Sequence, residues 1–458
     1  MSIDRTPDIS SGRLTLEEYA ANFSDLHPPL DQHQAFVEAD RCYFCYDAPC
    51  VHACPTGIDI PMFIREILTD NPKGAAETIL SANILGGMCA RVCPTETLCE
   101  EACVREKAEG KPVRIGELQR YATDAIMADG RQPFERAPAT GKRIAVIGGG
   151  PAGLSCAHRL AMHGHEVVVY DAKPKLGGLN EYGIAAYKTV NDFAAAEVDF
   201  ILSIGGILVE PHMALGRDFT LSDLRRKYDA VFVGLGLAGV NALGLTEEAL
   251  DGVADAVAYI ADLRQASDLG TLPVGRKVVV LGGGMTAIDI ASQSRRLGAE
   301  DVTIVYRRGA AKMGASEYER ELAQTDGVKI KLNATPRGLI AANGHVTGIE
   351  FEYTSETSGK LTGTGETFVL EADMVFKAIG QQFVPAVLNA SSEVIGSSEV
   401  ITLDAGRIKV DAERRTSLPG VWAGGDCVAG GKDLTVAAVE DGKVAAESIH
   451  RALTAIRP

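Results

Sequence analysis

Cysteine is concentrated in the first quarter of this chain, at spacings that suit metal ligation. Four thiols fall within thirteen residues of the stretch RCYFCYDAPCVHACP, and a second group of four follows. The two groups are Cys42-x2-Cys45-x4-Cys50-x3-Cys54-Pro55 and Cys89-x3-Cys93-Pro94-x4-Cys99-x3-Cys103. A tight loop can wrap one face of a four-iron cluster while the cysteine before a proline reaches a second cluster. Eight cysteines match the eight ligands that two such clusters need.

Disulfides and zinc are the alternatives to iron–sulfur clusters. The N-terminus MSIDRTPDIS has no basic stretch followed by an apolar one, so we expect no secretory signal and a cytoplasmic protein. Stable disulfides are rare in that reducing compartment. Structural zinc usually takes two close pairs of ligands, which four thiols in one short run match poorly. We therefore predict clusters, and expect Cys156 and Cys427 to be buried packing residues.

Composition argues against some partners. The 458 residues carry a formal net charge of -16 without a basic run, so the chain should repel nucleic acid and anionic lipid. Its longest weakly polar run, residues 230–245, is too short and too glycine-rich to span a bilayer. We expect neither a nucleic-acid partner nor a membrane partner.

A glycine turn after the strand IAVI predicts a dinucleotide site. Glycine lets the backbone approach a pyrophosphate at the start of the following helix, and Asp171 closes the next strand, where it can bind ribose. Near the C-terminus, GVWAGGDCV is followed by a helix that starts at Thr435 with a free N-terminus, which would favour a reduced flavin. This pairing predicts the FAD domain of the disulfide-reductase class, with candidate contacts Gly148, Gly149, Gly150, Pro151, Ala152, Gly153, Asp171, Gly425, Asp426 and Thr435.

A second glycine turn lies 134 residues further on and predicts the nicotinamide coenzyme site. Its second strand ends in VTIVYRR, so Arg307 and Arg308 stand where an NAD site would place an acid. A guanidinium suits a 2′-phosphate, which favours NADPH over NADH. The candidate contacts are Gly282, Gly283, Gly284, Met285, Thr286, Ala287, Arg307, Arg308, Ala378, Ile379 and Gly380.

These signals divide the chain into three domains. Apolar residues recur at helical spacing among the cysteines, and the polar segment 129–143 reads as a linker. The predicted class is α/β: an α-helical iron–sulfur domain followed by two Rossmann-like domains in the two-dinucleotide-binding arrangement of disulfide reductases. The expected bounds are 1–138 for the iron–sulfur domain, 139–245 with 382–458 for the FAD domain, and 246–381 for the NAD(P)H domain.

Several motifs together resemble one family over essentially the whole chain. CYFCYDAPCVHACPTGIDIPMFI, GAAETILSANILGGMCARVCPTETLCEEAC, IGELQRYATD, both glycine turns and the GGD segment resemble the N-terminal half of dihydropyrimidine dehydrogenases and the separate small subunit of the bacterial enzymes. The resemblance implies that Gln119 replaces a cysteine ligand and that Cys89 binds no iron. It assigns one cluster to Cys42, Cys45, Cys50 and Cys103, and the other to Cys54, Cys93, Cys99 and Gln119.

The resemblance also implies further cofactor contacts. It places Val92, Gly178, Leu179 and Thr435 at the flavin, with Lys188 in the position of a family arginine. An arginine that supports the 2′-phosphate in the family aligns with Gly314, with Lys312 close by in sequence. No side chain is assigned a catalytic role, because the cofactors carry the chemistry.

The family's FMN barrel and its further clusters have no counterpart in this sequence. The resemblance therefore implies a hetero-oligomer, in which an FMN- and iron–sulfur-containing large subunit reduces uracil or thymine to 5,6-dihydropyrimidines. This chain would take hydride from NAD(P)H, hold two electrons on FAD and pass them singly through two 4Fe-4S clusters. One alternative is a glutamate synthase small subunit or NADPH:ferredoxin-type oxidoreductase, which typically has glutamate where this chain has Gln119. A non-catalytic redox-sensing module is the alternative from another class.

Overall fold

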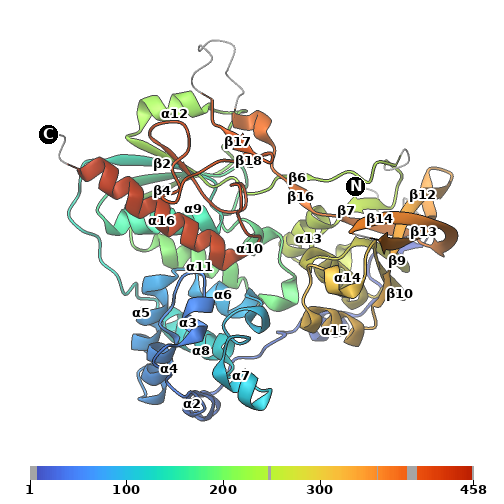
Figure 1. The fold of residues 1–458 in the computed structure, drawn as a ribbon, viewed down its shortest axis with the longest axis horizontal. Coiled ribbons are helices and arrows are strands. Elements are labelled where there is room, and N and C mark those ends of the chain that lie inside the picture. The colour runs from blue at the N-terminus through green and yellow to red at the C-terminus, as the bar shows by residue number, and fades with distance from the viewer. Residues whose placement is uncertain (1–7, 246–248, 358, 389–399, 456–458) are drawn as a thin grey trace. The chain divides into compact units, whose positions relative to one another are not determined.

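The computed structural model describes residues 8–245, 249–357, 359–388 and 400–455. The chain forms two compact units. The larger unit, called the cysteine unit below, comprises 27–181, 191–238 and the described part of 383–458. The smaller unit comprises the described parts of 1–26, 182–190 and 239–382. Figure 1 labels their helices and strands.

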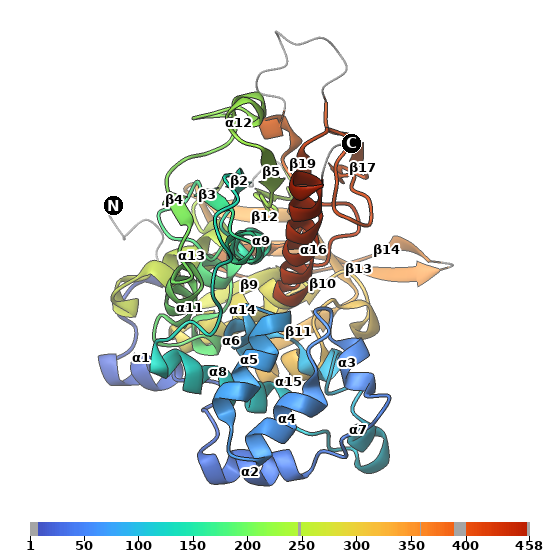
Figure 2. The ribbon, with the colours of Figure 1, turned by 90° about the vertical axis from the view of Figure 1, so that its left-hand side faces the viewer.

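The N-terminal part of the cysteine unit is a cluster of short helices. Polar caps define the starts of some of them: Asp31 accepts from the Gln34 amide at α2, and Asp59 accepts from the Met62 amide at α4. Apolar faces around Phe63, Ile79 and Leu118 pack α4, α5 and α8 into one core (Figure 2). The elements are α2 (Gln32–Asp40), α3 (Pro49–Ala53), α4 (Ile60–Leu68), α5 (Pro72–Ala82), α6 (Gly86–Val92), η1 (Thr95–Thr97), α7 (Val104–Glu109) and α8 (Ile115–Asp129).

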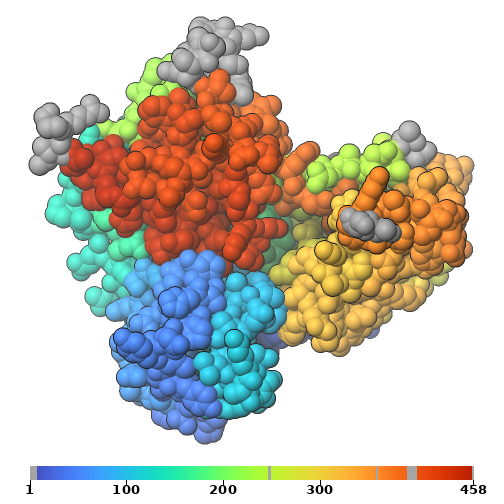
Figure 3. Space-filling view, viewed as in Figure 1, coloured from blue at the N-terminus to red at the C-terminus, as the bar shows by residue number. Residues whose placement is uncertain are grey.

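The rest of the cysteine unit is a parallel sheet with helices packed on it. The strand order is β19-β5-β2-β3-β4, and the apolar strand β2 lies in the middle. Helix α16 runs beside α9, and α6 also packs on α16 (Figure 1). In the space-filling view, the C-terminal part of this unit, in red, lies directly against its N-terminal helices, in blue (Figure 3). The elements are β2 (Arg143–Ile147), α9 (Pro151–Met162), β3 (Glu166–Tyr170), α10 (Leu179–Tyr182), α11 (Phe193–Leu202), β4 (Ile207–Glu210), α12 (Leu221–Lys227), β5 (Ala230–Val233), η5 (Pro385–Leu388), β17 (Leu403–Asp404), β18 (Arg407–Ile408), β19 (Val421–Ala423) and α16 (Thr435–Thr454).

The smaller unit is built on a second parallel sheet, of order β11-β10-β9-β15-β7. A three-stranded antiparallel sheet, β12-β13-β14, adds a long hairpin. The elements are β1 (Ile9–Ser10), α1 (Leu16–Asn22), η2 (Ala186–Lys188), β6 (Gly239–Val240), β7 (Val253–Asp255), α13 (Ala256–Gln265), η3 (Leu269–Thr271), β8 (Val274–Gly275), β9 (Lys277–Gly282), α14 (Met285–Arg296), β10 (Asp301–Tyr306), η4 (Ala310–Lys312), α15 (Glu317–Thr325), β11 (Lys329–Leu332), β12 (Ala334–Ala342), β13 (His345–Thr357), β14 (Lys360–Glu371), β15 (Met374–Ala378) and β16 (Gln381–Gln382).

The predicted fold class is confirmed by the helical N-terminal part and the two parallel sheets. The burial predicted for Cys156 and Cys427 is confirmed as well. The structure adds that β1 pairs with β8 and that Tyr19 of α1 lies in the core of the smaller unit. The predicted domain bounds stay predictions, and the bound between 245 and 246 adjoins residues outside the described part of the chain. In that described part, no helix is long and apolar enough to cross a membrane.

Candidate cofactor sites

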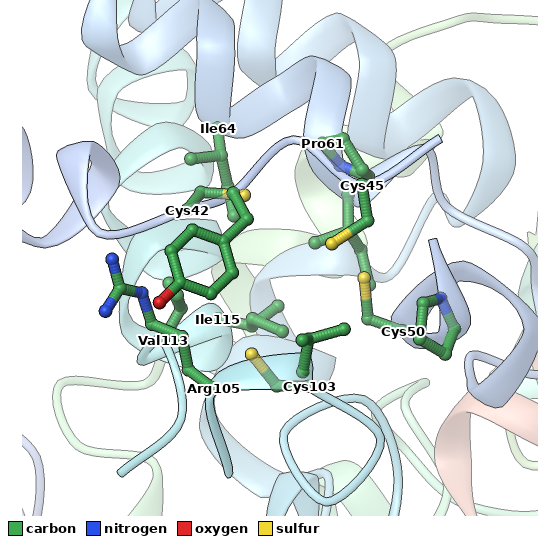
Figure 4. Close-up of a pocket in the computed structure, with 13 residues that line it drawn as sticks. Cys42, Cys45, Cys50, Pro61, Ile64, Cys103, Arg105, Val113 and Ile115 are labelled. Carbon is green, nitrogen blue, oxygen red and sulfur yellow. The ribbon is translucent and has the colours of Figure 1, made fainter. Parts of the chain in front are cut away.

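Four thiols of the cysteine unit surround one cavity, called the first cavity below. Figure 4 shows the sulfurs of Cys42, Cys45, Cys50 and Cys103 turned toward a common space. These are the four cysteines that the family resemblance assigns to one cluster. The loop before α3 and the N-cap of α7 bring them together across the sequence.

The first cavity is apolar and lies close to solvent. Ile64 and Ile115 supply its inner wall, and the exposed Tyr43 lies at its edge with Arg105 stacked on the ring at 4.0 Å. Burial raises the pKa of the Cys50 thiol to about 12. Bound iron would supply the positive charge that favours the thiolate form of Cys50.

A second cavity contains the other predicted ligand set. It is lined by Cys54, Cys93, Cys99 and Gln119, with Cys89 and Asn83 in the same wall. The side-chain Nε2 of Gln119 donates to the Gly86 carbonyl at 2.6 Å, which fixes the orientation of the amide. An amide held in this way can present its oxygen to iron, so the donor set fits a cluster with one neutral ligand.

Cys89 lies in this wall too, so the structure leaves two candidates for the fourth ligand. Its side chain is 3% exposed and interacts with Cys93. That interaction, together with burial, raises the pKa of Cys93 well above its ordinary value. The assignment of iron to Gln119 and not to Cys89 remains a prediction. Among the described residues, no three His, Cys, Asp or Glu side chains could hold a single metal ion.

A buried carboxyl that no sequence motif indicated holds the start of α6. Glu197 of α11 accepts from the amides of Gly87 and Met88, at 2.8 and 3.0 Å, at the start of α6. Burial raises the pKa of Glu197 to about 8. The residue fixes the helix that carries Cys89 and leads to Cys93. An acid on a different helix gave no sequence signal, because nothing in its spacing ties it to the cysteines.

The first glycine turn is packed too tightly for other residues. Gly148 has a φ of +96°, and a Cβ there would lie 2.2 Å from the Gly234 carbonyl oxygen. A Cβ on Gly153 would meet the Gly148 carbonyl oxygen at 1.9 Å. Pro151 and Ala152 begin α9, whose N-cap Gly150 has no side-chain hydrogen bond, so the first amides of α9 are available to a pyrophosphate.

Two carboxylates flank this turn, as expected for FAD. Asp171 accepts from the Gly149 amide at 2.7 Å and from the Lys173 amide at 2.8 Å, while burial raises its pKa. Burial and the neighbouring Asp433 raise the pKa of Asp426 to about 6. Gly425, with a φ of +86°, approaches Ala152 of α9 and so places the GGD segment beside the first turn.

The remaining predicted flavin contacts lie around the start of α16. Gly178 approaches the Gly150 backbone, and Leu179 begins α10. Thr435 donates to Asn180 Oδ1 at 2.7 Å, which joins α10 to the first turn of α16. The helix has no side-chain cap at its N-terminus. Val92 is half-buried at the end of α6, which packs on α16.

The start of α16 also reaches the second cavity. Val436, the residue after Thr435, lines that cavity together with Cys54 and Gln119. Ile60 lines both cavities. The predicted flavin contacts, the second cavity and the first cavity are therefore consecutive neighbours within one unit.

The second glycine turn belongs to the smaller unit and fits a dinucleotide. A Cβ on Gly282 would lie 2.2 Å from the Ala378 carbonyl oxygen, and one on Gly283 would meet the Tyr306 ring. Gly284 faces open space at the N-cap of α14. The free first amides of α14, which starts with Met285 and Thr286 before the buried Ala287, can therefore meet a pyrophosphate.

The basic residues near this turn differ in their surroundings. The Arg307 side chain is exposed, whereas Arg308 lies 3.8 Å from Glu356. Gly314 approaches Gly284, and the Lys312 carbonyl accepts from the Tyr306 hydroxyl at 2.6 Å. This loop therefore folds back onto the glycine turn.

The other predicted residues of this region lie at the end of β15 and in η2. The Ile379 and Gly380 carbonyls, just after Ala378, both accept from the Asn241 side chain. Lys188 is buried, and its ammonium contacts Asp289 and Glu319, each at 2.8 Å. Burial alone would lower the pKa of Lys188, but Asp289 and other neighbours outweigh it and raise that pKa. The expected flavin contact of Lys188 stays a prediction, because its charge is already paired inside the smaller unit.

Comparisons with known proteins identify the class. Residues 142–442 match the family described as pyridine nucleotide-disulphide oxidoreductase. Residues 19–131 match the family described as dihydropyrimidine dehydrogenase domain II, 4Fe-4S cluster. The chain belongs to the pyridine nucleotide-disulphide oxidoreductases and is an iron–sulfur oxidoreductase.

Two individual proteins are similar to nearly the whole chain, and one solved structure shares the fold. The chain is 36% identical over 429 residues to the NAD-dependent dihydropyrimidine dehydrogenase subunit PreT of Salmonella typhimurium, covering 94% of this chain and 97% of that protein. It is 35% identical over 448 residues to the glutamate synthase [NADPH] small chain of Escherichia coli, covering 93% of both. Mycobacterium tuberculosis FprA in complex with NADPH shares the fold, with a TM-score of 0.55 at 19% identity, over 68% of this chain and 84% of that one.

Proposed function

We propose that this chain is the NAD(P)H-oxidising electron-input subunit of a dihydropyrimidine dehydrogenase whose partner is an FMN- and iron–sulfur-containing large subunit. The observation that carries the proposal is the second cavity, where Cys54, Cys93, Cys99 and Gln119 line one space together with Cys89. When bound, FAD accepts two electrons from the reduced coenzyme and releases them singly to two 4Fe-4S clusters. In this proposal the partner, and not this chain, reduces uracil or thymine.

The residues on the route have distinct tasks in this proposal. The amides at the start of α16 stabilise a reduced flavin through the positive end of the helix. Val436 separates that helix start from the second cavity, and Ile60 separates the second cavity from the first. A cluster in the first cavity would be the one nearest the partner, because the edge of that cavity reaches solvent at Tyr43.

NADPH is the coenzyme we propose, with NADH as the alternative. Arg307 is exposed beyond the strand that an NAD site would end with an acid, so it is free to meet a 2′-phosphate. The names of the relatives support both coenzymes, because PreT is named NAD-dependent and the glutamate synthase small chain is named with NADPH.

Substitution of Arg307 tests the coenzyme proposal. Arg307→Ala should raise the KM for NADPH about ten- to a hundredfold, since a charge-assisted contact contributes roughly 1.5 to 3 kcal/mol. The KM for NADH should hardly change, because NADH lacks the phosphate. Equal use of both coenzymes by the unaltered protein would contradict the proposal.

The glutamate synthase small subunit is the second candidate, favoured by nearly equal identity to that relative. Gln119 in the second cavity favours the dihydropyrimidine dehydrogenase, because the family resemblance gives glutamate synthase small subunits a glutamate there. A non-catalytic redox-sensing module needs no nicotinamide site. Rapid bleaching of bound flavin on adding NADPH would therefore argue against such a module.

The direct experiment compares the isolated chain with a reconstituted complex. Purified without oxygen, the chain should reduce ferricyanide with NADPH and should leave uracil unchanged. Adding the FMN-containing subunit of a dihydropyrimidine dehydrogenase should start uracil reduction. Reduction of uracil by the isolated chain would contradict the proposal, and productive coupling only to a glutamate synthase large subunit would support the second candidate.

A further inference from the structure

Asn83 is a fully buried amide in the wall of the second cavity. Its side chain is 0% exposed and lines that cavity beside Cys93 and Gln119. Its Oδ1 accepts from the Leu85 amide at 3.1 Å, in the short link between α5 and α6. That bond sets the orientation of the side chain. Within the described residues, Nδ2 of Asn83 has no hydrogen-bond partner.

A buried donor without an acceptor is costly. Leaving an amide N–H group unsatisfied in a protein interior costs about 1–3 kcal/mol. Leucine has nearly the same shape as asparagine and would fill this position without that cost. The unpaired Nδ2 therefore points to an acceptor that occupies the cavity in the assembled protein.

The sulfurs of an iron–sulfur cluster are the acceptors that suit this position. The cavity that Asn83 lines is walled by the thiols of Cys54, Cys93 and Cys99. A neighbouring contact follows the same pattern, because the Thr56 hydroxyl lies 3.3 Å from the Cys54 sulfur. The Thr56 hydroxyl therefore already has a sulfur as its hydrogen-bond partner. Among the described residues, Asn83 Nδ2 has no such partner.

We infer that Asn83 donates a hydrogen bond from Nδ2 to a sulfur of the cluster in the second cavity and thereby raises the reduction potential of that cluster. The inference rests on the proposed function only in requiring that the cavity holds a cluster. Reduction adds negative charge to the cluster, and a donor directed at a sulfur stabilises that added charge. Asn83 is therefore a positioning residue that sets how readily the second cluster takes an electron.

The test is a redox titration of the reconstituted protein, followed by electron paramagnetic resonance. The signal of the second cluster is the one that survives in a Cys50→Ala protein. In Asn83→Leu, the ratio of reduced to oxidised second cluster at a fixed potential should fall about tenfold, which is about 59 mV for a one-electron couple. The signal of the first cluster should titrate as before. An unchanged ratio for the second cluster would overturn the inference.

Asn71 supplies a matched control on the same helix. It caps the opposite end of α5, where its Oδ1 accepts from the Gly74 amide at 3.1 Å. Asn71→Leu weakens α5 without approaching either cavity, so both clusters should keep their potentials. A shift of the second cluster in Asn71→Leu as large as in Asn83→Leu would show that helix damage, not the lost donor, causes it.

A second measurement does not depend on the folding of a variant. With the asparagine side-chain amides labelled with nitrogen-15, pulsed electron paramagnetic resonance on the unaltered, reduced protein should show one labelled nitrogen coupled to the second cluster. Absence of that coupling would overturn the inference while the iron content still supports the proposed function. A second cavity without iron would overturn both.

Discussion

The two cysteine cavities belong to one unit but differ in how they would offset the negative charge of a cluster. The first offers four thiols near solvent, with Arg105 at its edge. The second is lined by four cysteines, Cys89 among them, and by the neutral amide of Gln119, and its wall includes the fully buried Asn83. We expect Arg105 and nearby solvent to offset the charge of a cluster in the first cavity, and the neutral Gln119 and the Asn83 donor to do so in the second.

Removing one cysteine from each set should have the largest effect. The unaltered protein should contain about eight irons and one FAD, and Cys93→Ala should lose the second cluster, about four irons. Cys50→Ala should lose the first cluster and a similar amount. Iron analysis of anaerobically purified protein measures both. Cys89→Ala is the control that should keep all the iron, and zinc in place of iron would contradict the account.

Replacing Gln119 by cysteine should make the second cavity more like the first, because a thiol would stand in the place of the neutral amide. Gln119→Cys should retain the cluster but lower its reduction potential, because a fourth thiolate adds a negative charge. The shift should exceed that of Asn83→Leu, which removes only a dipole. Potentiometric titration measures the shift, and Gln119→Glu should move the potential in the same direction. An unchanged potential in Gln119→Cys would indicate that Cys89 is the natural ligand.

Replacing Arg105 should change the reduction potential of the first cluster only, and by a small amount. Its guanidinium lines the first cavity and stacks on Tyr43 at 4.0 Å. Arg105→Gln should lower the potential of the first cluster slightly, since solvent already screens the charge, and raising the salt concentration should reduce the difference. The same titration follows both clusters. A shift of the second cluster instead would contradict the separation of the two sites.

Rising pH should lower the stability of the folded protein through Glu197, which holds the start of α6. Burial raises its folded pKa to about 8, above the ordinary 4.5, so the folded protein retains a proton that the unfolded chain releases. The associated stability is fully present below pH 4.5 and is lost as the pH rises through 8, by a few kcal/mol at most. Thermal unfolding between pH 5 and 9 should show this loss.

Glu197→Gln is the control for that titration. It keeps an acceptor for the Gly87 and Met88 amides but has no proton to lose. Its thermal stability should therefore vary less with pH across this range. Identical pH profiles for the two proteins would exclude Glu197 as the titrating group.

The sequence predicted the parts of these sites that local spacing encodes. Glycine turns followed by helices, and cysteines at loop spacing, have a local physical cause. Gln119 came only from a family resemblance, because nothing in an isolated helix distinguishes a ligand glutamine from a surface one. Asn83, Val436 and Glu197 came only from the structure, since tertiary packing brings Asn83 and Val436 to the second cavity and Glu197 to the start of α6.

Substitution of Cys54 tests most directly whether electrons reach the partner only through a cluster in the second cavity. Cys54 lines the second cavity with Val436, next to the start of α16. In a complex with the FMN-containing subunit, Cys54→Ala should keep most of the NADPH-to-ferricyanide activity and lose uracil reduction. Uracil reduction by Cys54→Ala at the rate of the unaltered complex would contradict the route through the two cavities.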